Sequence, residues 1–126
     1  MAQANRALPL ISRIVDDLMR YHARWQEMIA ACELLLASNS PRSHGQVLDL
    51  QREIQQTAAE IDRFRKELDD LGVFFKDFEA GLVDFPGLFN DRDILLCWKI
   101  GESSVEYWHE VDAGFTGRQP ITAEIG

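Results

Sequence analysis

The stretch ISRIVDDLMRYHARWQEMIAACELL (residues 11–35) decides the fold, because its apolar residues recur at spacings that alternate between three and four. This is the a/d pattern of a heptad repeat, and it predicts a long helix over residues 8–37. Asn5 is the expected N-cap, and Pro9 falls in the first turn, where a missing N–H costs nothing. The apolar positions of this seam are Ile11, Ile14, Leu18, Tyr21, Trp25, Met28, Cys32 and Leu35.

A second seam with the same alternating spacing follows a turn-forming segment at residues 38–45. It predicts a helix over residues 46–71, ended by Gly72 at the C′ position. Because the connection is short, the two helices should form an antiparallel coiled-coil hairpin, in a register that places Trp25 opposite Thr57. The second seam consists of Val47, Leu50, Ile54, Thr57, Ile61, Phe64, Leu68 and Leu71.

One flank of the first helix carries a further apolar strip, formed by Val15, His22, Ile29 and Leu36. A two-helix hairpin alone would leave this strip in water, so the β region, a second copy of the chain or another protein must cover it. We expect self-association through these four residues, which would give a homodimer.

Helical periodicity stops at residue 73, where aromatic, β-branched and glycine residues become frequent. The pattern predicts short strands separated by turns at residues 80–81, 86–93 and 101–104. The predicted strands cover residues 73–78, 82–85, 94–100 and 105–111.

The chain of 126 residues has room for one domain. We expect the helical hairpin at residues 1–72, a β-meander at 73–112 and an irregular tail at 113–126. The fold class is therefore α+β, a long antiparallel two-helix coiled-coil hairpin followed by a small antiparallel β-sheet.

The last predicted hairpin has a two-residue turn and pairs Cys97 with Trp108. This register also brings the opposite charges of Lys99 and Glu106 together across the strands, which supports it. In the same register Cys97 and His109 lie on opposite faces of the sheet, which argues against a shared metal site.

Thirteen basic residues stand against 21 acidic ones, a formal net charge of −8. This balance lacks the basic surface that binds nucleic acid phosphates, and an anionic membrane would repel it. No apolar run reaches the roughly 20 residues of a membrane span, and no segment has the pattern of a signal peptide. The two cysteines, Cys32 and Cys97, form no disulfide framework, so we expect a cytoplasmic protein.

Several short motifs of the β region resemble one prokaryotic family, the domain of unknown function numbered 2203. These motifs are GV (72–73), KD (76–77), GLVDFP (81–86), LCW (96–98), GE (101–102), WHE (108–110), GF (114–115) and GRQP (117–120). The resemblance covers nearly the whole chain, helices included. It implies a bacterial cytoplasmic protein of this size and assigns no activity, cofactor or catalytic residue.

The β region also holds the side chains most suited to chemistry. Carboxylates together with a histidine can bind Zn²⁺, Mn²⁺ or Fe²⁺, and the predicted ligands are His109, Glu102, Glu110 and Asp112. No recognised ligand spacing is present, so the alternative is that His109 is a partly buried strand residue among surface acids. Cys97 fits a small buried hydrophobe better than a nucleophile. We expect no organic cofactor.

Three further residues are candidates for contacts with a partner or an anion, namely Trp108, Arg118 and Asp84. Aromatic residues are enriched at protein interfaces. Arg118 lies between glycine-containing turns, where it can bind an anion or form an ion pair within the acidic β region.

These observations favour a non-enzymatic, self-associating interaction or scaffold protein. The alternative is a small metal-dependent enzyme, of the hydrolase kind, with a histidine and carboxylate site in the β region. A third hypothesis is a small-molecule sensor that binds its ligand between the sheet and the hairpin.

Overall fold

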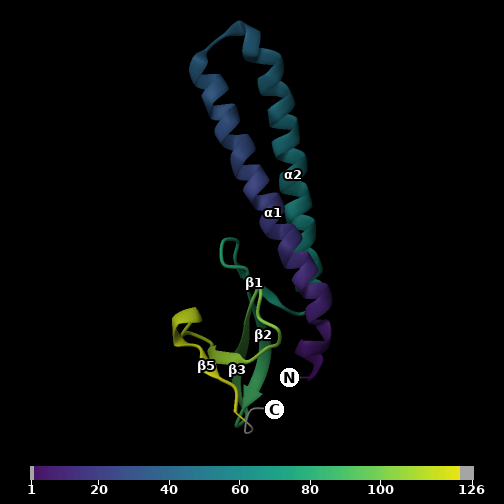
Figure 1. Ribbon diagram of the computed structural model, residues 1–126, viewed down its shortest axis with the longest axis vertical. Coiled ribbons are helices and arrows are strands. Elements are labelled where there is room, and N and C mark those ends of the chain that lie inside the picture. The colour runs from purple at the N-terminus through teal and green to yellow at the C-terminus, as the bar shows by residue number, and fades with distance from the viewer. Residues whose placement is uncertain (1, 123–126) are drawn as a thin grey trace.

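The computed structural model describes residues 2–122, which form two long helices followed by a five-stranded antiparallel sheet. Helix α1 (Ala2–Ser38) and helix α2 (His44–Asp70) pack against each other and are joined through a short 3-10 turn, η1 (Pro41–Ser43). The two helices project from the sheet as a hairpin (Figure 1). The predicted α+β class is confirmed.

The five strands lie in the order in which they occur along the chain, and each is antiparallel to its neighbour. The structure is therefore a meander. The elements are β1 (Phe74–Asp77), β2 (Leu82–Phe89), β3 (Arg92–Lys99), β4 (Tyr107–Glu110), the 3-10 turn η2 (Phe115–Gly117) and β5 (Gln119–Pro120).

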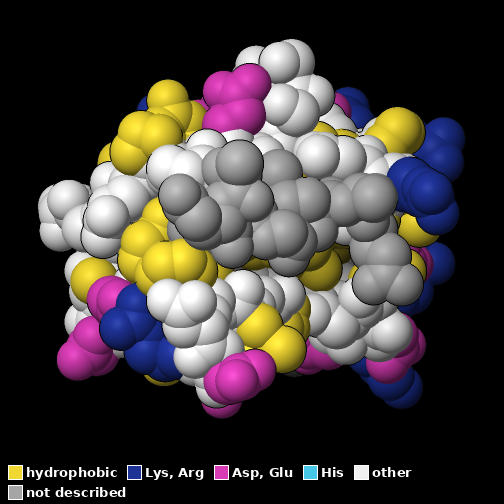
Figure 2. Space-filling model, turned by 90° about the horizontal axis from the view of Figure 1, so that it is seen from below, with side chains coloured by type: hydrophobic (Ala, Val, Ile, Leu, Met, Phe, Trp, Pro, Cys, Tyr) yellow, Lys and Arg dark blue, Asp and Glu magenta, His cyan; other side chains and the backbone are white. Residues whose placement is uncertain are grey.

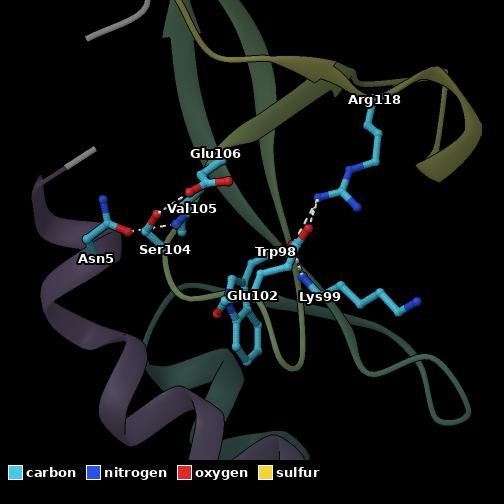
Figure 3. Close-up of polar contacts among 8 residues, drawn as sticks. All are labelled: Asn5, Trp98, Lys99, Glu102, Ser104, Val105, Glu106 and Arg118. Atoms are coloured by element: carbon cyan, nitrogen blue, oxygen red, sulfur yellow. Dashed lines mark hydrogen bonds and ion pairs between the residues drawn. The ribbon is translucent and has the colours of Figure 1, made fainter.

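Helix α1 begins before the predicted start at residue 8, so Asn5 is not an N-cap and Pro9 lies inside the helix. The side-chain oxygen of Asn5 instead accepts a hydrogen bond from the backbone N–H of Val105, 2.7 Å away (Figure 3). Ala4 and Leu8 are buried in the core. This tertiary packing offsets the hydrogen bond that Pro9 removes from the first turns.

Helix α2 ends as predicted, with Gly72 in the left-handed conformation at φ +78°. The N–H of Gly72 donates to the carbonyl of Asp69 (2.9 Å), and the N–H of Val73 donates to that of Leu68 (3.1 Å). This is the Schellman arrangement, and the side chains of its two apolar residues, Leu68 and Val73, are both buried. It fixes the direction in which the chain leaves the hairpin for β1.

The predicted seams are buried over much of the hairpin. The ring of Tyr21 meets that of Phe64 edge to face, with centroids 5.2 Å apart. Trp25 is half-buried against the same core, and Thr57 on the other helix is buried. The other buried seam residues are Ile11, Ile14, Leu18, Met28, Cys32, Val47, Ile61 and Leu68.

The turn predicted at residues 86–93 was wrong. Strands β2 and β3 continue to a two-residue turn at Asn90 and Asp91, whose φ angles are +52° and +62°. Positive angles at both positions match the twist of a hairpin, and Asn and Asp tolerate them. Pro86 is accommodated inside β2 because β1 pairs with this strand only as far as Asp84, which leaves Pro86 at the edge of the sheet.

The register of β3 and β4 differs by one residue from the predicted one. Cys97 lies opposite Tyr107 instead of Trp108. Because side chains alternate along a strand, a slip of one residue moves all of them to the other face. The placement of Cys97 and His109 on opposite faces was therefore wrong, and both side chains lie on the same face.

The slip arises in the connection between these strands, which is longer than a two-residue turn. Glu102 stabilises this loop with its own backbone and side chain (Figure 3). Its carbonyl accepts a hydrogen bond from Nε1 of Trp98 (2.9 Å), and its Oε1 accepts one from the N–H of Lys99 (2.7 Å). Strand β4 consequently starts at Tyr107, later than predicted.

The two faces of the sheet are buried against different parts of the chain. The face toward the helices contributes apolar residues to the core, namely Val83, Phe85, Ile94, Leu96, Trp98 and Trp108. The opposite face carries Asp84, Cys97 and His109, and these three are also buried. In Figure 1 the yellow C-terminal segment and the purple start of α1 lie on opposite sides of the sheet.

The predicted irregular tail contains regular structure in its first part. Strand β5 pairs with β4, Tyr107 opposite Pro120 and Trp108 opposite Gln119. Residues 123–126 of the predicted tail lie outside the described residues.

Seen from below, the sheet end of the molecule mixes apolar, acidic and basic side chains (Figure 2). Within residues 2–122, no helix combines the length and the apolar character needed to cross a membrane.

Candidate metal centre

Three potential metal ligands from three neighbouring strands meet on the face of the sheet that is turned away from the helices. Asp84 of β2, Cys97 of β3 and His109 of β4 each offer one ligand atom, and these atoms all lie within 4.8 Å of one another. Asp84 is paired directly with Cys97, and His109 lies two residues along the neighbouring strand from the partner of Cys97, opposite Leu95 and on the same face. The meander thus brings together residues that are 25 positions apart.

All three side chains are removed from water. The exposed fraction is 4% for Asp84, 1% for Cys97 and 2% for His109. Buried polar groups of this kind are unfavourable unless they are bonded to one another or to an ion. Their partners therefore decide what the cluster can do.

The hydrogen bonds of His109 fix its tautomer. Nδ1 lies 2.7 Å from the backbone carbonyl oxygen of Glu110, which can only accept, so Nδ1 carries a hydrogen. In a neutral ring, Nε2 is then an acceptor, yet it faces Oδ1 of Asp84 at 3.1 Å. Two acceptors at this distance require a positive species between them, which is either a proton or a metal ion.

Cys97 is a protonated thiol in the metal-free protein. Burial raises the pKa of this thiol from its ordinary value of 9.0 to about 11, and the negative charge of Asp84 acts in the same direction, while Arg118 opposes it. Such a thiol is a poor nucleophile near neutral pH. It can still bind a metal ion, because the ion displaces the thiol proton.

A cavity of about 170 Å³ adjoins the cluster. Besides the three candidate ligands it is lined by Lys76, Leu82, Leu95, Val111, Gly114 and Phe115. The last three of these residues belong to the segment after β4, which covers this face of the sheet. The cluster therefore borders a small, mostly apolar space instead of a tightly filled core.

Of the four predicted metal ligands, the structure places only His109 in the cluster. Both carboxylate oxygens of Glu102 accept from Nη2 of Arg118 at 2.9 Å. The carboxylate of Glu110 pairs with Arg92 at 2.9 Å, so this residue serves His109 only through its backbone carbonyl. Asp112 is exposed and lies beyond the end of β4.

The three residues predicted to contact a partner or an anion have partners within the chain. Trp108 is 7% exposed and packs against Phe89, with ring centroids 5.7 Å apart. Arg118 forms the ion pair with Glu102 that the sequence offered as its alternative role. Asp84 bonds His109. The burial of Trp108 follows from the one-residue slip, which turns this ring into the core.

Sequence reasoning did not identify Asp84 and Cys97 as ligands. Neither belongs to a recognised ligand spacing, and the predicted register separated Cys97 from His109. The sequence feature that could have revealed the candidate site is the presence of Asp84, Cys97 and His109 in three separate predicted strands. Shifting the last strand by one residue places all three on one face.

The strip predicted for self-association is partly covered by the β region of the same chain. Val15 is fully buried in the core, and the ring of His22 stacks on that of Phe78, with centroids 4.0 Å apart and planes at 14°. Ile29 is half-buried, and Leu36 is 56% exposed. Only the part of the strip nearest the hairpin tip is open to another molecule.

A cavity of about 460 Å³ lies at the hairpin tip. Its lining residues are Leu35, Leu36, Asn39, Ser40, Pro41, Ser43, His44 and Val47. Leu34 and Leu48 nearby are 75% and 48% exposed. Between residues 28 and 48 the only charged side chains are Glu33 and Arg42, so the tip is a neutral part of an acidic chain.

Comparison with known proteins identifies one family. The model of a family described as an uncharacterized conserved protein (DUF2203) matches residues 1–121. The resemblance of the short motifs is thereby confirmed. No curated protein and no solved structure matches the chain.

Proposed function

The chain belongs to the DUF2203 family, and because that description names no activity, we propose from the geometry of the site that it is a zinc-binding protein. The proposed ligands are Asp84, Cys97 and His109. The observation that supports this proposal most strongly is the contact between Nε2 of His109 and Oδ1 of Asp84, where a proton or a metal ion must lie between two acceptors, beside the thiol of Cys97.

The donor set favours zinc over the other divalent ions. Sulfur, imidazole nitrogen and carboxylate oxygen together are ligands that Zn²⁺ accepts, whereas Mg²⁺ and Ca²⁺ prefer oxygen alone. In a tetrahedral zinc site the ligand atoms are about 3.4 Å apart. The separations of at most 4.8 Å in the cluster require only small side-chain movements to reach this value.

The bond from Nδ1 of His109 to the carbonyl of Glu110 supports the same assignment. A histidine that binds a metal through one nitrogen commonly donates its other N–H to a carbonyl or carboxylate, which fixes the tautomer and the ring orientation. Here this outer bond leaves Nε2 directed toward the other two ligands.

Three protein ligands beside a cavity indicate a reaction centre more than a structural zinc site. Structural sites have four protein ligands, whereas catalytic sites keep the fourth position open. When bound, Zn²⁺ supplies a Lewis acid and a water molecule activated for attack. We therefore favour metal-dependent hydrolysis, the second of the functions predicted from the sequence, with Lys76 as the cationic residue of the cavity wall.

Metal analysis of the untagged protein tests the proposal. We expect one Zn²⁺ per chain after loading and dialysis, and a thiolate-to-cobalt charge-transfer band when Co²⁺ replaces it. Cys97→Ser should remove the band and most of the zinc, whereas Cys32→Ser, which alters the buried cysteine of the helical seam, should retain both. Absence of bound metal in the wild type, or retention of the band in Cys97→Ser, would overturn the proposal.

Self-association through the hairpin tip is a second candidate function, because the tip exposes Leu34, Leu36 and Leu48. Exposed apolar groups around a cavity are typical of interaction sites. The occupant that fits best is a second copy of this chain. In a molecule of net charge −8, two neutral tips can meet without the repulsion that other surfaces would cause.

A further inference from the structure

One wall of the cavity beside the candidate metal centre is formed by residues 111–120, which we call the strap. Val111, Gly114 and Phe115 of the strap line the cavity beside Asp84, Cys97 and His109. On the other side of the three ligands lies the sheet itself. Among the described residues, the part of the cavity wall that lies outside the sheet comes from the strap, so movement of the strap would widen access to the cluster.

The side chain of Arg118 attaches the strap to the rest of the chain. Nη2 of this residue donates to both carboxylate oxygens of Glu102 at 2.9 Å, which joins the strap to the β3–β4 loop (Figure 3). The guanidinium also lies over the rings of Tyr107 and Phe115, with its carbon 3.9 Å and 4.8 Å from their centroids. Charge-assisted pairs and cation–π contacts of this kind are the stronger polar interactions of a protein.

Besides Arg118, the strap is joined to the sheet by the short strand β5 and, at its end, by the hydrogen bond from the N–H of Ile121 to the carbonyl of Glu106 (2.8 Å). Strand β5 consists of only two residues, Gln119 and Pro120. Most strap residues are exposed, and Gly114 has a φ of +71°, a conformation that favours glycine. Nε of Arg118 is buried and has no hydrogen-bond partner, which disfavours the closed position. Segments with few buried contacts open locally at low free energy.

We propose that the strap is a gate of the metal centre and that the ion pair of Arg118 with Glu102 is its latch. Opening the pair releases Phe115 from the cavity and exposes Asp84, Cys97 and His109 to ions and small molecules. The biological meaning of the gate rests on the proposed zinc site, but the gate itself can be measured without metal.

The thiol of Cys97 reports the opening of the strap in the metal-free protein. The rate of its alkylation by iodoacetamide can be measured by peptide mass spectrometry, with Cys32 of the same molecule as an internal reference. Because Arg118 lowers the pKa of this thiol, its removal alone would slow alkylation. Acceleration in Arg118→Ala must therefore come from greater access.

We expect Arg118→Ala to accelerate alkylation of Cys97 about tenfold or more, with Cys32 unchanged. Arg118→Lys keeps the charge but loses the paired geometry and the stacking, so it should give a smaller acceleration and serves if the alanine variant does not fold. The matched control is Arg92→Ala, which removes the exposed ion pair with Glu110. Its rates should equal those of the wild type.

Low concentrations of urea separate local from global opening. A rate in Arg118→Ala that is insensitive to urea indicates local movement of the strap, whereas a rate that rises with the slope of unfolding indicates loss of the whole fold and overturns the gate. Equal Cys97 rates in the wild type and both Arg118 variants would also overturn it. If Arg118→Ala accelerates alkylation of Cys97 but the wild type binds no zinc, the zinc site is refuted and the gate is retained. If the wild type binds zinc but Arg118→Ala leaves the alkylation rate unchanged, the gate is refuted and the zinc site is retained.

Discussion

Nε2 of His109 and Oδ1 of Asp84 lie 3.1 Å apart across the middle strand of the sheet, although the second nitrogen of the histidine is already committed to the carbonyl of Glu110. This contact is stable only with a positive species between the two atoms. A proton and the zinc ion that we propose would therefore exclude each other from this position. A substitution of Asp84 that supplies its own hydrogen-bond donor therefore separates folding from the proposed metal binding.

Asp84→Asn should leave the metal-free protein folded and remove its response to zinc. The amide N–H of the new side chain can donate to neutral Nε2, so the contact survives without a cation. Thermal melting with and without Zn²⁺ measures the effect. In the wild type, zinc at about 100 times its dissociation constant should add about 2.7 kcal/mol to the free energy of unfolding. A zinc response retained by Asp84→Asn would contradict the proposed ligand set.

Alkaline pH should destabilise the metal-free protein through Cys97. Because the pKa of its thiol is about 11 in the folded state and 9.0 ordinarily, the folded state holds more protons between these values. The stabilising contribution is complete below pH 9 and is lost as the pH rises toward 11. The difference in the free energy of unfolding between the wild type and Cys97→Ala should therefore fall over this interval in denaturant titrations. A constant difference would show that burial does not raise this pKa.

Gly81→Ala should destabilise the protein by about 1–3 kcal/mol. Gly81 has a φ of +67°, and a Cβ atom there would lie 2.6 Å from Cγ2 of Ile100 and 2.9 Å from Sδ of Met19. Gly45→Ala is the matched control, because its Cβ meets nothing within 4 Å and the residue lies in helix α2. Denaturant unfolding should show Gly45→Ala to be neutral or stabilising. Equal effects of the two variants would be inconsistent with close packing of α1 on the turn before β2.

Leu36→Asp should convert a dimer into a monomer in sedimentation velocity experiments, and Ile29→Asp should act in the same direction. A buried carboxylate at the neutral tip is strongly unfavourable in an interface. Leu88→Asp is the control, because Leu88 is 61% exposed but lies in β2, away from the tip. A monomeric wild type, or a dimer that Leu36→Asp leaves intact, would rule out association through the tip.

The helical half of the fold could be predicted because its determinants are local. Alternating spacings reveal a seam on one helix face, and Gly72 marks a helix end through its own backbone conformation. The start of α1 could not be predicted, because Asn5 bonds Val105, a residue 100 positions away. Distant contacts of this kind overrule local capping preferences.

Whether Cys97 and His109 lie close together depends on the register of β3 with β4, which the sequence did not determine. The attraction expected between Lys99 and Glu106 favoured a tight turn, whereas the bonds of Glu102 to Trp98 and Lys99 lengthen the loop. Both arrangements satisfy the alternation of apolar residues about equally well. The residue type alone singled out His109, and its neighbours Asp84 and Cys97 were missed because their proximity depends on that single-residue difference.

Because Asp84, Cys97 and His109 come from three successive strands, no fragment that lacks any part of residues 84–109 contains the complete cluster. A nascent polypeptide presents these groups one at a time, separated by flexible backbone, and gains their combined affinity only after residue 109 has joined the sheet. Ion capture would thus occur after assembly, and a chain truncated before β4 would be unable to sequester metal during synthesis.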